Sequence, residues 1–433
     1  MRLSRLLLGA WLALALALLP GGPARAGPRT VLIPSAGIPQ PTRLGDIVGL
    51  VLQNLGRTAT PVMPLTIGEV FKQGAVMPHD QLMLDAGKLV PVQMDPRTYN
   101  SDGSVAMATL TVMAPPLPAR TATGAMLMHA PASAPPPAAP VNLAAALANY
   151  SLSVIFDFKT PGGSANRITV DGVTALQAGL QKGAASIWRH GPEATEALVS
   201  VPVRRSFRVV FDITAFANGT FSSDVRFDND VAMGPRGGRV TYGEQVIQDG
   251  RTVSRQGDIT QYQYQDWHAV VGTTASPADV NIQHDIAYLE ATGAVPEFDL
   301  HLGVVASLPA QEAAIMAKPG WGAPLSPNGI SQYMPAVGGR SDIGPTTAWN
   351  AAWLMTQNAI AARFALGQAD AAGAVPWHFF DPATGQYLTT DDIPNIWTSP
   401  SYHTDGTTIP TQLVSAGTGW AADVSHQIGR AHV

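Results

Sequence analysis

Residues that can perform acid–base chemistry are concentrated towards the C-terminal end of the sequence. The candidates for a catalytic role are Arg340, His378, Asp381, Asp423 and His426. A histidine titrates near neutral pH and can abstract a proton, while an arginine can hold a carboxylate through two parallel hydrogen bonds. These residue types therefore suit removal of the proton α to the carboxylate of a uronic acid, which begins β-elimination.

Aromatic residues are interleaved with these candidates. Trp349, Trp377 and Trp397, together with His403, have the composition of a sugar-binding surface. Aromatic rings stack on the apolar C–H faces of a pyranose, while neighbouring polar groups bind its hydroxyls. The expected partner is therefore a polysaccharide or oligosaccharide. The alternative interpretation is structural, because tryptophan and histidine also fill irregular loops.

A second cluster lies earlier in the chain. Trp267 and His268 are adjacent, and His284 precedes Asp285. One of these histidines could act as a general base, and Trp267, His268 and His284 could bind substrate. If this segment is a strand, His284 and Ile286 share one face and Asp285 lies on the other. The alternative is that these groups are buried and hydrogen-bonded at a domain interface.

One acidic segment could bind calcium through oxygen ligands, and it comprises Asp224, Asp228, Asn229 and Asp230. Its spacing is not that of an EF-hand, and it follows a strand. We therefore expect a turn with exposed acidic side chains and keep Ca²⁺ as the alternative. No residues are predicted to ligate a transition metal, and no other cofactor is indicated. The sequence lacks G-x-S-x-G, H-E-x-x-H, P-loop and Rossmann motifs.

The composition excludes several classes of function. The 433 residues include no cysteine, which rules out thiol catalysis and cysteine-ligated zinc or iron–sulfur clusters. The formal net charge is −5 and there is no basic patch, so we expect no nucleic-acid binding. Charged residues make up only 13% of the chain, and the many Gly and Pro residues favour a β-rich exported protein.

Residues 1–26 have the pattern of a secretory signal peptide. Arg2 and Arg5 precede an apolar run over residues 6–19, and Ala24-Arg25-Ala26 provides the small-x-small cleavage site. The apolar run is shorter than the roughly 20 residues of a membrane-spanning helix. We expect cleavage after Ala26 and a secreted or periplasmic protein without a membrane anchor.

The remaining chain divides by composition and residue pattern, and the fold class we predict is mainly β, with two β-sandwich-like domains followed by the beginning of a helical domain. Residues 27–113 form an N-terminal β domain, 114–149 a Pro/Ala-rich connector, and 150–312 a central β-sandwich with strands of alternating polarity. Residues 313–427 begin a helical domain, opened by one amphipathic helix over 346–372. Residues 374–427 are expected to be loop-like.

We hypothesise that the last six residues, IGRAHV at 428–433, are not part of the native protein. They correspond to the translation of a commonly used sequencing adapter, whose next codon is a stop. We expect the native sequence to end at Gln427 and the helical domain to be truncated.

Several short blocks resemble a known family. GEVF (68–71), GAVMP (74–78), PVQMD (91–95) and DGS (102–104) resemble the N-terminal β domain of exo-acting rhamnogalacturonan lyases and their relatives. Further blocks resemble the uncharacterised exported bacterial branch of that family, and they lie at 188–192 with Glu196, 229–230, 284–289, 338–344, 377–381 and 423–427. The resemblance implies two β domains followed by an α/α barrel, and release of units from pectic rhamnogalacturonan by β-elimination.

We therefore expect an exported, polysaccharide lyase-like protein that acts on a uronate-containing glycan. Two alternatives remain. A glycoside hydrolase needs two carboxylates at a defined separation, and Asp342, Asp381, Asp405 and Asp423 could supply them. A secreted glycan-binding or structural β-sandwich protein needs no catalytic group.

Overall fold

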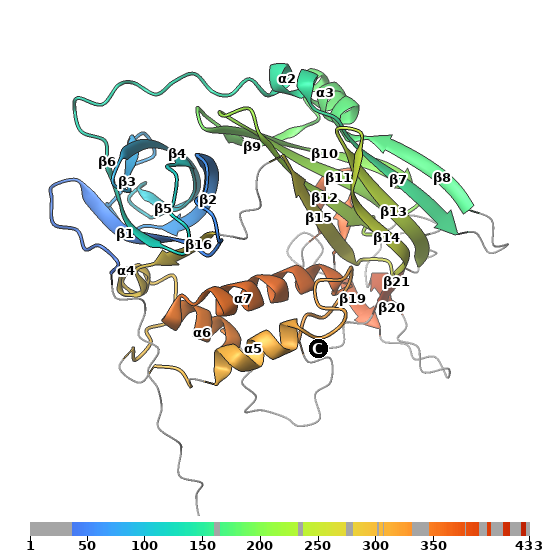
Figure 1. The fold of residues 1–433 in the computed structure, drawn as a ribbon. Helices are drawn as coiled ribbons and strands as arrows, with labels where there is room; N and C mark the ends of the chain where they lie inside the picture. Colours follow the sequence, from blue (N-terminus) through green and yellow to red (C-terminus); the bar gives the residue numbers. More distant parts are fainter. Residues whose placement is uncertain are drawn as a thin grey trace, which may run out of the picture.

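The computed structural model describes eleven stretches of the chain. They are residues 37–159, 165–232, 237–273, 280–300, 303–305, 307–330, 346–376, 378–388, 396–399, 410–415 and 426–429. The predicted signal peptide and residues 430–433 lie outside them. Within the described stretches the structure is mainly β, as predicted, with several antiparallel sheets (Figure 1). No helix in these stretches is long and apolar enough to cross a membrane.

The first β unit is a strongly curved seven-stranded sheet with the order β16-β1-β6-β3-β4-β5-β2. Its strands are β1 (Asp46–Asn54), β2 (Met63–Val70), β3 (Leu82–Asp85), β4 (Leu89–Tyr99), β5 (Val105–Ala114), β6 (Ala122–His129) and β16 (Val280–His284). β3 and β4 form a hairpin around a turn at Gly87, which has φ +83°. β16 pairs with β1, so this sheet takes a strand from the segment that the sequence assigns to the central domain.

The second β unit is a sandwich, as predicted. A four-stranded sheet has the order β14-β13-β7-β8, and a five-stranded sheet has the order β15-β12-β11-β10-β9. The strands are β7 (Leu152–Lys159), β8 (Ala165–Asp171), β9 (Ser186–His190), β10 (Ala194–Arg204), β11 (Phe207–Phe216), β12 (Phe221–Asp228), β13 (Val240–Gln248), β14 (Arg251–Gln261) and β15 (Asp266–Gly272). Helix α3 (Gly172–Lys182) follows β8.

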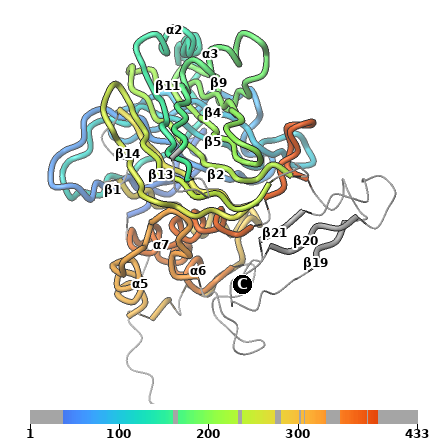
Figure 2. The backbone as a smooth tube through the Cα atoms, turned by 90° about the vertical axis from the view of Figure 1, so that its right-hand side faces the viewer, coloured from blue at the N-terminus to red at the C-terminus, as the bar shows by residue number. Residues whose placement is uncertain are grey.

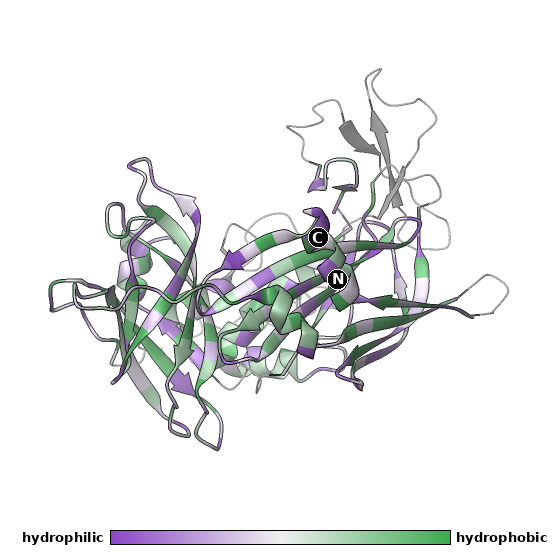
Figure 3. Ribbon diagram, turned by 90° about the horizontal axis from the view of Figure 1, so that it is seen from above, coloured by the Kyte–Doolittle hydropathy of each residue, from purple (hydrophilic) through white to green (hydrophobic). Residues whose placement is uncertain are grey.

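Alternating polarity determines how the two sheets face each other (Figure 3). Phe156 and Phe158 of β7 are buried against Phe207 of β11, with ring centroids 5.5 Å apart in both pairs. Val209 and Phe211 continue this inner face. Because side chains alternate along a strand, the residues between them must point to the outer face of the five-stranded sheet. That outer face carries the site described below.

Helices follow the β units and lie beneath both of them (Figures 1 and 2). They are α4 (Ile286–Ala291), α5 (Leu308–Met316), α6 (Ala348–Thr356) and α7 (Ala359–Ala371), preceded by the short α2 (Leu143–Ala146) in the connector. Short strands then appear where a loop was expected: β17 (Phe380–Asp381), β18 (Gln386–Tyr387), β19 (Ile396–Ser399), β20 (Pro410–Ser415) and β21 (His426–Gly429). The α/α barrel stays a prediction.

The single helix expected over residues 346–372 is wrong, because the chain breaks at Gln357. This residue has φ +52°, a left-handed conformation that ends α6, and Asn358 then caps α7. Tertiary contacts hold the break in place: the Gln357 carbonyl accepts a hydrogen bond from Asn281, and its side chain accepts one from the His284 amide. Gln357 therefore anchors the helices to β16.

Candidate functional site on the outer face of the five-stranded sheet

Charged side chains cover the outer face of the five-stranded sheet. Strand register brings them together, since Asp212 of β11 is opposite Asp224 of β12, and Asp228 of β12 is opposite Asp266 of β15. Like charges directly opposite one another are unfavourable unless protons or cations compensate them. The charged residues of this face include Arg189, Glu196, Arg208, Asp212, Asp224, Arg226, Asp228, Asp266 and His268.

The end of β12 carries a buried ionic cluster. Arg208 donates from Nε and Nη2 to the two carboxylate oxygens of Asp230, at 2.7 and 2.6 Å, and its Nη2 lies 2.8 Å from Asp228 Oδ2. Asp228 and Asp230 are fully buried, so the expectation of an exposed acidic turn is wrong. Burial and the neighbouring Asp230 carboxylate raise the pKa of Asp228 to about 7, and burial raises the pKa of Asp266 well above its ordinary value.

The segment around β17 and β18 covers this cluster. The Phe380 amide donates to the Asp230 carbonyl at 3.0 Å, and the Phe380 ring lies 3.7 Å from the Arg208 guanidinium carbon. Arg208 also donates to the Tyr387 hydroxyl at 3.0 Å. A cation–π contact with Phe380 and a hydrogen bond to Tyr387 thus hold the Arg208 guanidinium in place. A segment that follows the helices in the chain therefore lies over the end of β12.

His378 reaches this cluster, whereas Asp381 does not. His378 Nδ1 lies 3.7 Å from Asp266 Oδ2, and Nε2 lies 3.1 Å from the Ala372 carbonyl. Burial lowers the pKa of His378, which favours the neutral ring. The Asp381 carboxylate instead accepts hydrogen bonds from the Ala383 amide and the Thr384 hydroxyl, and so stabilises the turn between β17 and β18.

His268 lies between two carboxylates. Its Nδ1 is 2.9 Å from Asp224 Oδ1, and its Nε2 is 3.4 Å from Oδ1 of Asp370 in α7. Hydrogen bonds to these two aspartates raise the pKa of His268 to about 10. The ring is therefore an imidazolium at neutral pH. The prediction that a general base comes from this cluster does not hold for His268, which is a cation and a proton donor.

An acidic pair occupies the opposite end of the face. Burial and the neighbouring carboxylate of Glu196 raise the pKa of Asp212 to about 8. Glu196 is ion-paired with Arg189, which also donates to Thr66 and Thr111 of the first β unit at 2.9 and 3.0 Å. Arg189 thus connects the acidic pair to the other β unit.

The raised pKa of Asp212 predicts a pH dependence of stability. The folded protein holds this proton up to about pH 8, whereas the unfolded chain releases it near 3.8. The contribution of Asp212 is therefore fully present below the unfolded value and is lost as the pH rises through about 8. Urea titrations from acid to mildly alkaline pH should show that wild-type stability falls relative to Asp212→Asn over this range. Parallel profiles for the two proteins would contradict the assignment.

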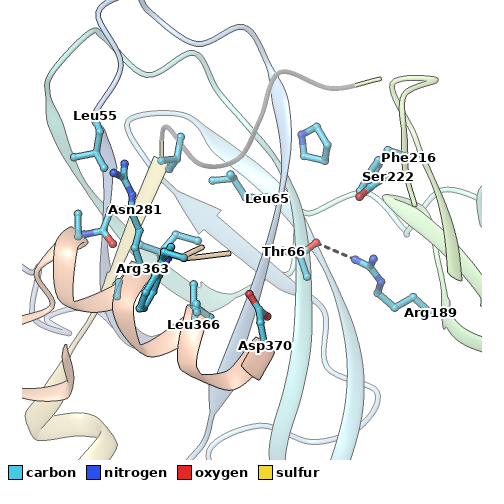
Figure 4. A pocket seen from close by; sticks show the side chains of 17 residues that line it. Leu55, Leu65, Thr66, Arg189, Phe216, Ser222, Asn281, Arg363, Leu366 and Asp370 are labelled. Atoms are coloured by element: carbon cyan, nitrogen blue, oxygen red, sulfur yellow. Dashed lines mark hydrogen bonds between the residues drawn. The ribbon is translucent and has the colours of Figure 1, made fainter. Parts of the chain in front are cut away.

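A cavity of about 680 Å³ separates α7 from the two β units (Figure 4). Arg363 and Asp370 line it from α7, and Arg189 lines it from β9. Its apolar walls include Leu65, Phe216, Trp321 and Leu366. Asp370 also lines a second cavity of about 250 Å³, which contains Asp266 and His268. Asp370 therefore links the larger cavity to the charged face.

Two predicted substrate-binding residues are structural instead. Trp267 stacks on Phe227 at 4.2 Å in the sandwich core and donates to the Tyr242 hydroxyl at 2.7 Å, so it cannot serve as a sugar platform. His284 lies 3.2 Å from Glu69 Oε2, which agrees with the interpretation of buried interface groups. Asp285 does not continue a strand, as the face assignment assumed, because its side chain caps α4.

For most of the other predicted site residues, the structure describes only the backbone or nothing. Trp349 packs on Phe364 between α6 and α7, with ring centroids 5.1 Å apart. Trp397 lies in β19 and His426 in β21, where only the backbone is described. Arg340, Trp377, His403 and Asp423 lie outside the described residues.

Sequence reasoning missed Arg208, Asp212 and Asp370. A signal for the first two was present, because Arg208 and Asp212 lie on alternate positions to the apolar Val209 and Phe211. Charged residues on the polar side of a strand are usually solvated, however, so the pattern alone does not distinguish a site. A scan against protein-family models and a search of curated proteins find no match for the chain.

Proposed function

We propose that the protein is an exported, carbohydrate-active enzyme of the lyase type that binds a uronate-containing glycan in the cavity above α7. The observation that carries the proposal is that Arg363 and Asp370 both line one wall of a cavity large enough for sugar units. The two residues are seven positions apart, which places them about two helical turns, or roughly 10 Å, apart along the helix.

This arrangement suits β-elimination. A guanidinium can bind the uronate carboxylate and stabilise the negative charge that develops when the neighbouring C–H bond breaks. A carboxylate at the same wall can accept the proton, and Asp370 is the group that could do so. His268 would hold Asp370 in place and, as an imidazolium, could return a proton to the leaving oxygen.

A hydrolase is the second candidate, and the acidic pair favours it. Asp212 is protonated at neutral pH and lies beside Glu196. Glycosidases also use two carboxyls with different acid and base roles, but hold them about 5 Å or more apart, farther than the hydrogen-bonded Asp212 and Glu196. Neither residue lines the larger cavity, which is why we place the lyase first.

One experiment separates these functions from simple binding. The full chain is incubated with uronate polysaccharides, including pectic ones, while ultraviolet absorbance of unsaturated uronates and new reducing ends are both recorded. A lyase increases both signals, and a hydrolase increases only the reducing ends. Retention of the chain on the polysaccharide without either signal would support a binding protein. No signal and no binding with any uronate polymer would remove the proposal.

A further inference from the structure

We infer that Asp228, Asp230 and Asp266 form a binding site for one divalent cation with a preference for oxygen ligands, namely Ca²⁺. Asp228 ends β12, Asp230 lies two residues later in the chain, and Asp266 begins β15. The site differs from the calcium segment expected from the sequence. Asp224 is turned to His268, and Asp266, which is close only in the fold, takes its place.

The spacing of the three carboxylates fits a calcium ion. One oxygen from each residue lies within 4.8 Å of the others. Calcium binds oxygens at about 2.3–2.6 Å, so two ligands on opposite sides of the ion are at most about 5 Å apart. One ion can therefore contact an oxygen of each of the three carboxylates. The strands need not shift relative to one another.

An independent observation is that Oδ1 of Asp228 has no hydrogen bond or ion pair among the described residues. Its side chain is fully buried, yet neither carboxylate oxygen has a hydrogen bond within the described part of the chain. Within the described stretches, the contacts of its Oδ2 are ion pairs, at 2.8 Å to Arg208 and 4.0 Å to Arg226. Asp266 Oδ1 is also buried and has no hydrogen bond to any residue that the structure describes. Buried carboxylate oxygens without partners are costly, and a cation among them removes that cost.

The charges around the site set the expected affinity. Arg208 contacts both oxygens of Asp230 and Oδ2 of Asp228, so Oδ1 of Asp228 and Oδ1 of Asp266 are the oxygens most available to an ion. The same guanidinium repels a cation, so the affinity should be modest. We expect a dissociation constant of about 10⁻⁴–10⁻³ M, the range of extracellular calcium modules.

The test is calorimetric titration of the full chain with Ca²⁺ after treatment with EDTA. We expect saturable binding by the wild type and a loss of more than about tenfold in affinity for Asp266→Asn, since even changes outside the ligand shell cost tenfold or more. Asp381→Asn is the matched control, because this carboxylate lies in the covering segment but bonds only within its own turn among the contacts described. It should bind Ca²⁺ as the wild type does.

Folding is checked by circular dichroism, and a thermal shift gives a second readout. Calcium should raise the melting temperature of the wild type and of Asp381→Asn, but not of Asp266→Asn, because only an intact site couples binding to the folded state. The inference is overturned if millimolar Ca²⁺ gives neither heat nor a thermal shift in the wild type. It is equally overturned if a folded Asp266→Asn protein binds Ca²⁺ with unchanged affinity.

Discussion

Replacing Arg208 by methionine should lower the free energy of unfolding at neutral pH by about 3–5 kcal/mol, the typical result of removing one partner from a buried ion pair. The side chain is almost completely buried and compensates Asp228 and Asp230, which are themselves fully buried. Methionine retains much of the volume but leaves these carboxylates without their counter-charge. Chemical denaturation of wild type and variant measures the difference.

Arg167→Met is the matched control for this change. Arg167 also donates from two nitrogens to one aspartate, Asp157, at 2.8 and 3.0 Å, but its side chain is 65% exposed. Solvated pairs contribute little, so its stability should stay close to that of the wild type. The deficit of Arg208→Met should also shrink at acid pH, because protonated carboxyls need no counter-charge. Equal effects of the two substitutions would show that burial is not the cause.

The sandwich could be predicted from the sequence because apolar and polar residues alternate along most of its strands. Phe156 and Phe158 identify the inner face of one sheet, and Val209 and Phe211 identify the inner face of the other. β16 could not be assigned in this way. Its apolar pattern identifies a strand, but its pairing with β1, more than two hundred residues away, depends on the space left at the edge of the first sheet.

The site was only partly predictable, for a related reason. Polar residues are expected on the outer side of a strand, so nothing local distinguishes Asp228, which is buried, from Asp224, which is half-exposed. The β17–β18 segment, distant in sequence, covers this end of β12, where Phe380 contacts Asp230 and Arg208. The role of His268 also depends on partners far apart in sequence, since hydrogen bonds to Asp224 and Asp370 together raise its pKa and make a candidate base a stable cation.

If the proposed lyase activity is found, Asp370→Asn should lower kcat by about 10²–10⁴-fold, the usual contribution of a positioned proton acceptor. The side chain is 54% exposed, so the change should leave folding intact. Asp258→Asn is the control, because Asp258 is likewise an exposed aspartate with an ion-pair partner, Lys159 at 3.2 Å, but lies on the four-stranded sheet. Its activity should equal that of the wild type.

A split between kcat and KM would separate the two roles on α7. Asp370 is proposed to act only as the C–H bond breaks, so its loss should appear in kcat with little change in KM. Arg363 is proposed to hold the carboxylate already in the bound substrate, so Arg363→Met should raise KM as well. General damage to the helix would change both variants alike. Full activity of Asp370→Asn would place the chemistry elsewhere, and the cavity above α7 would then be at most a binding site.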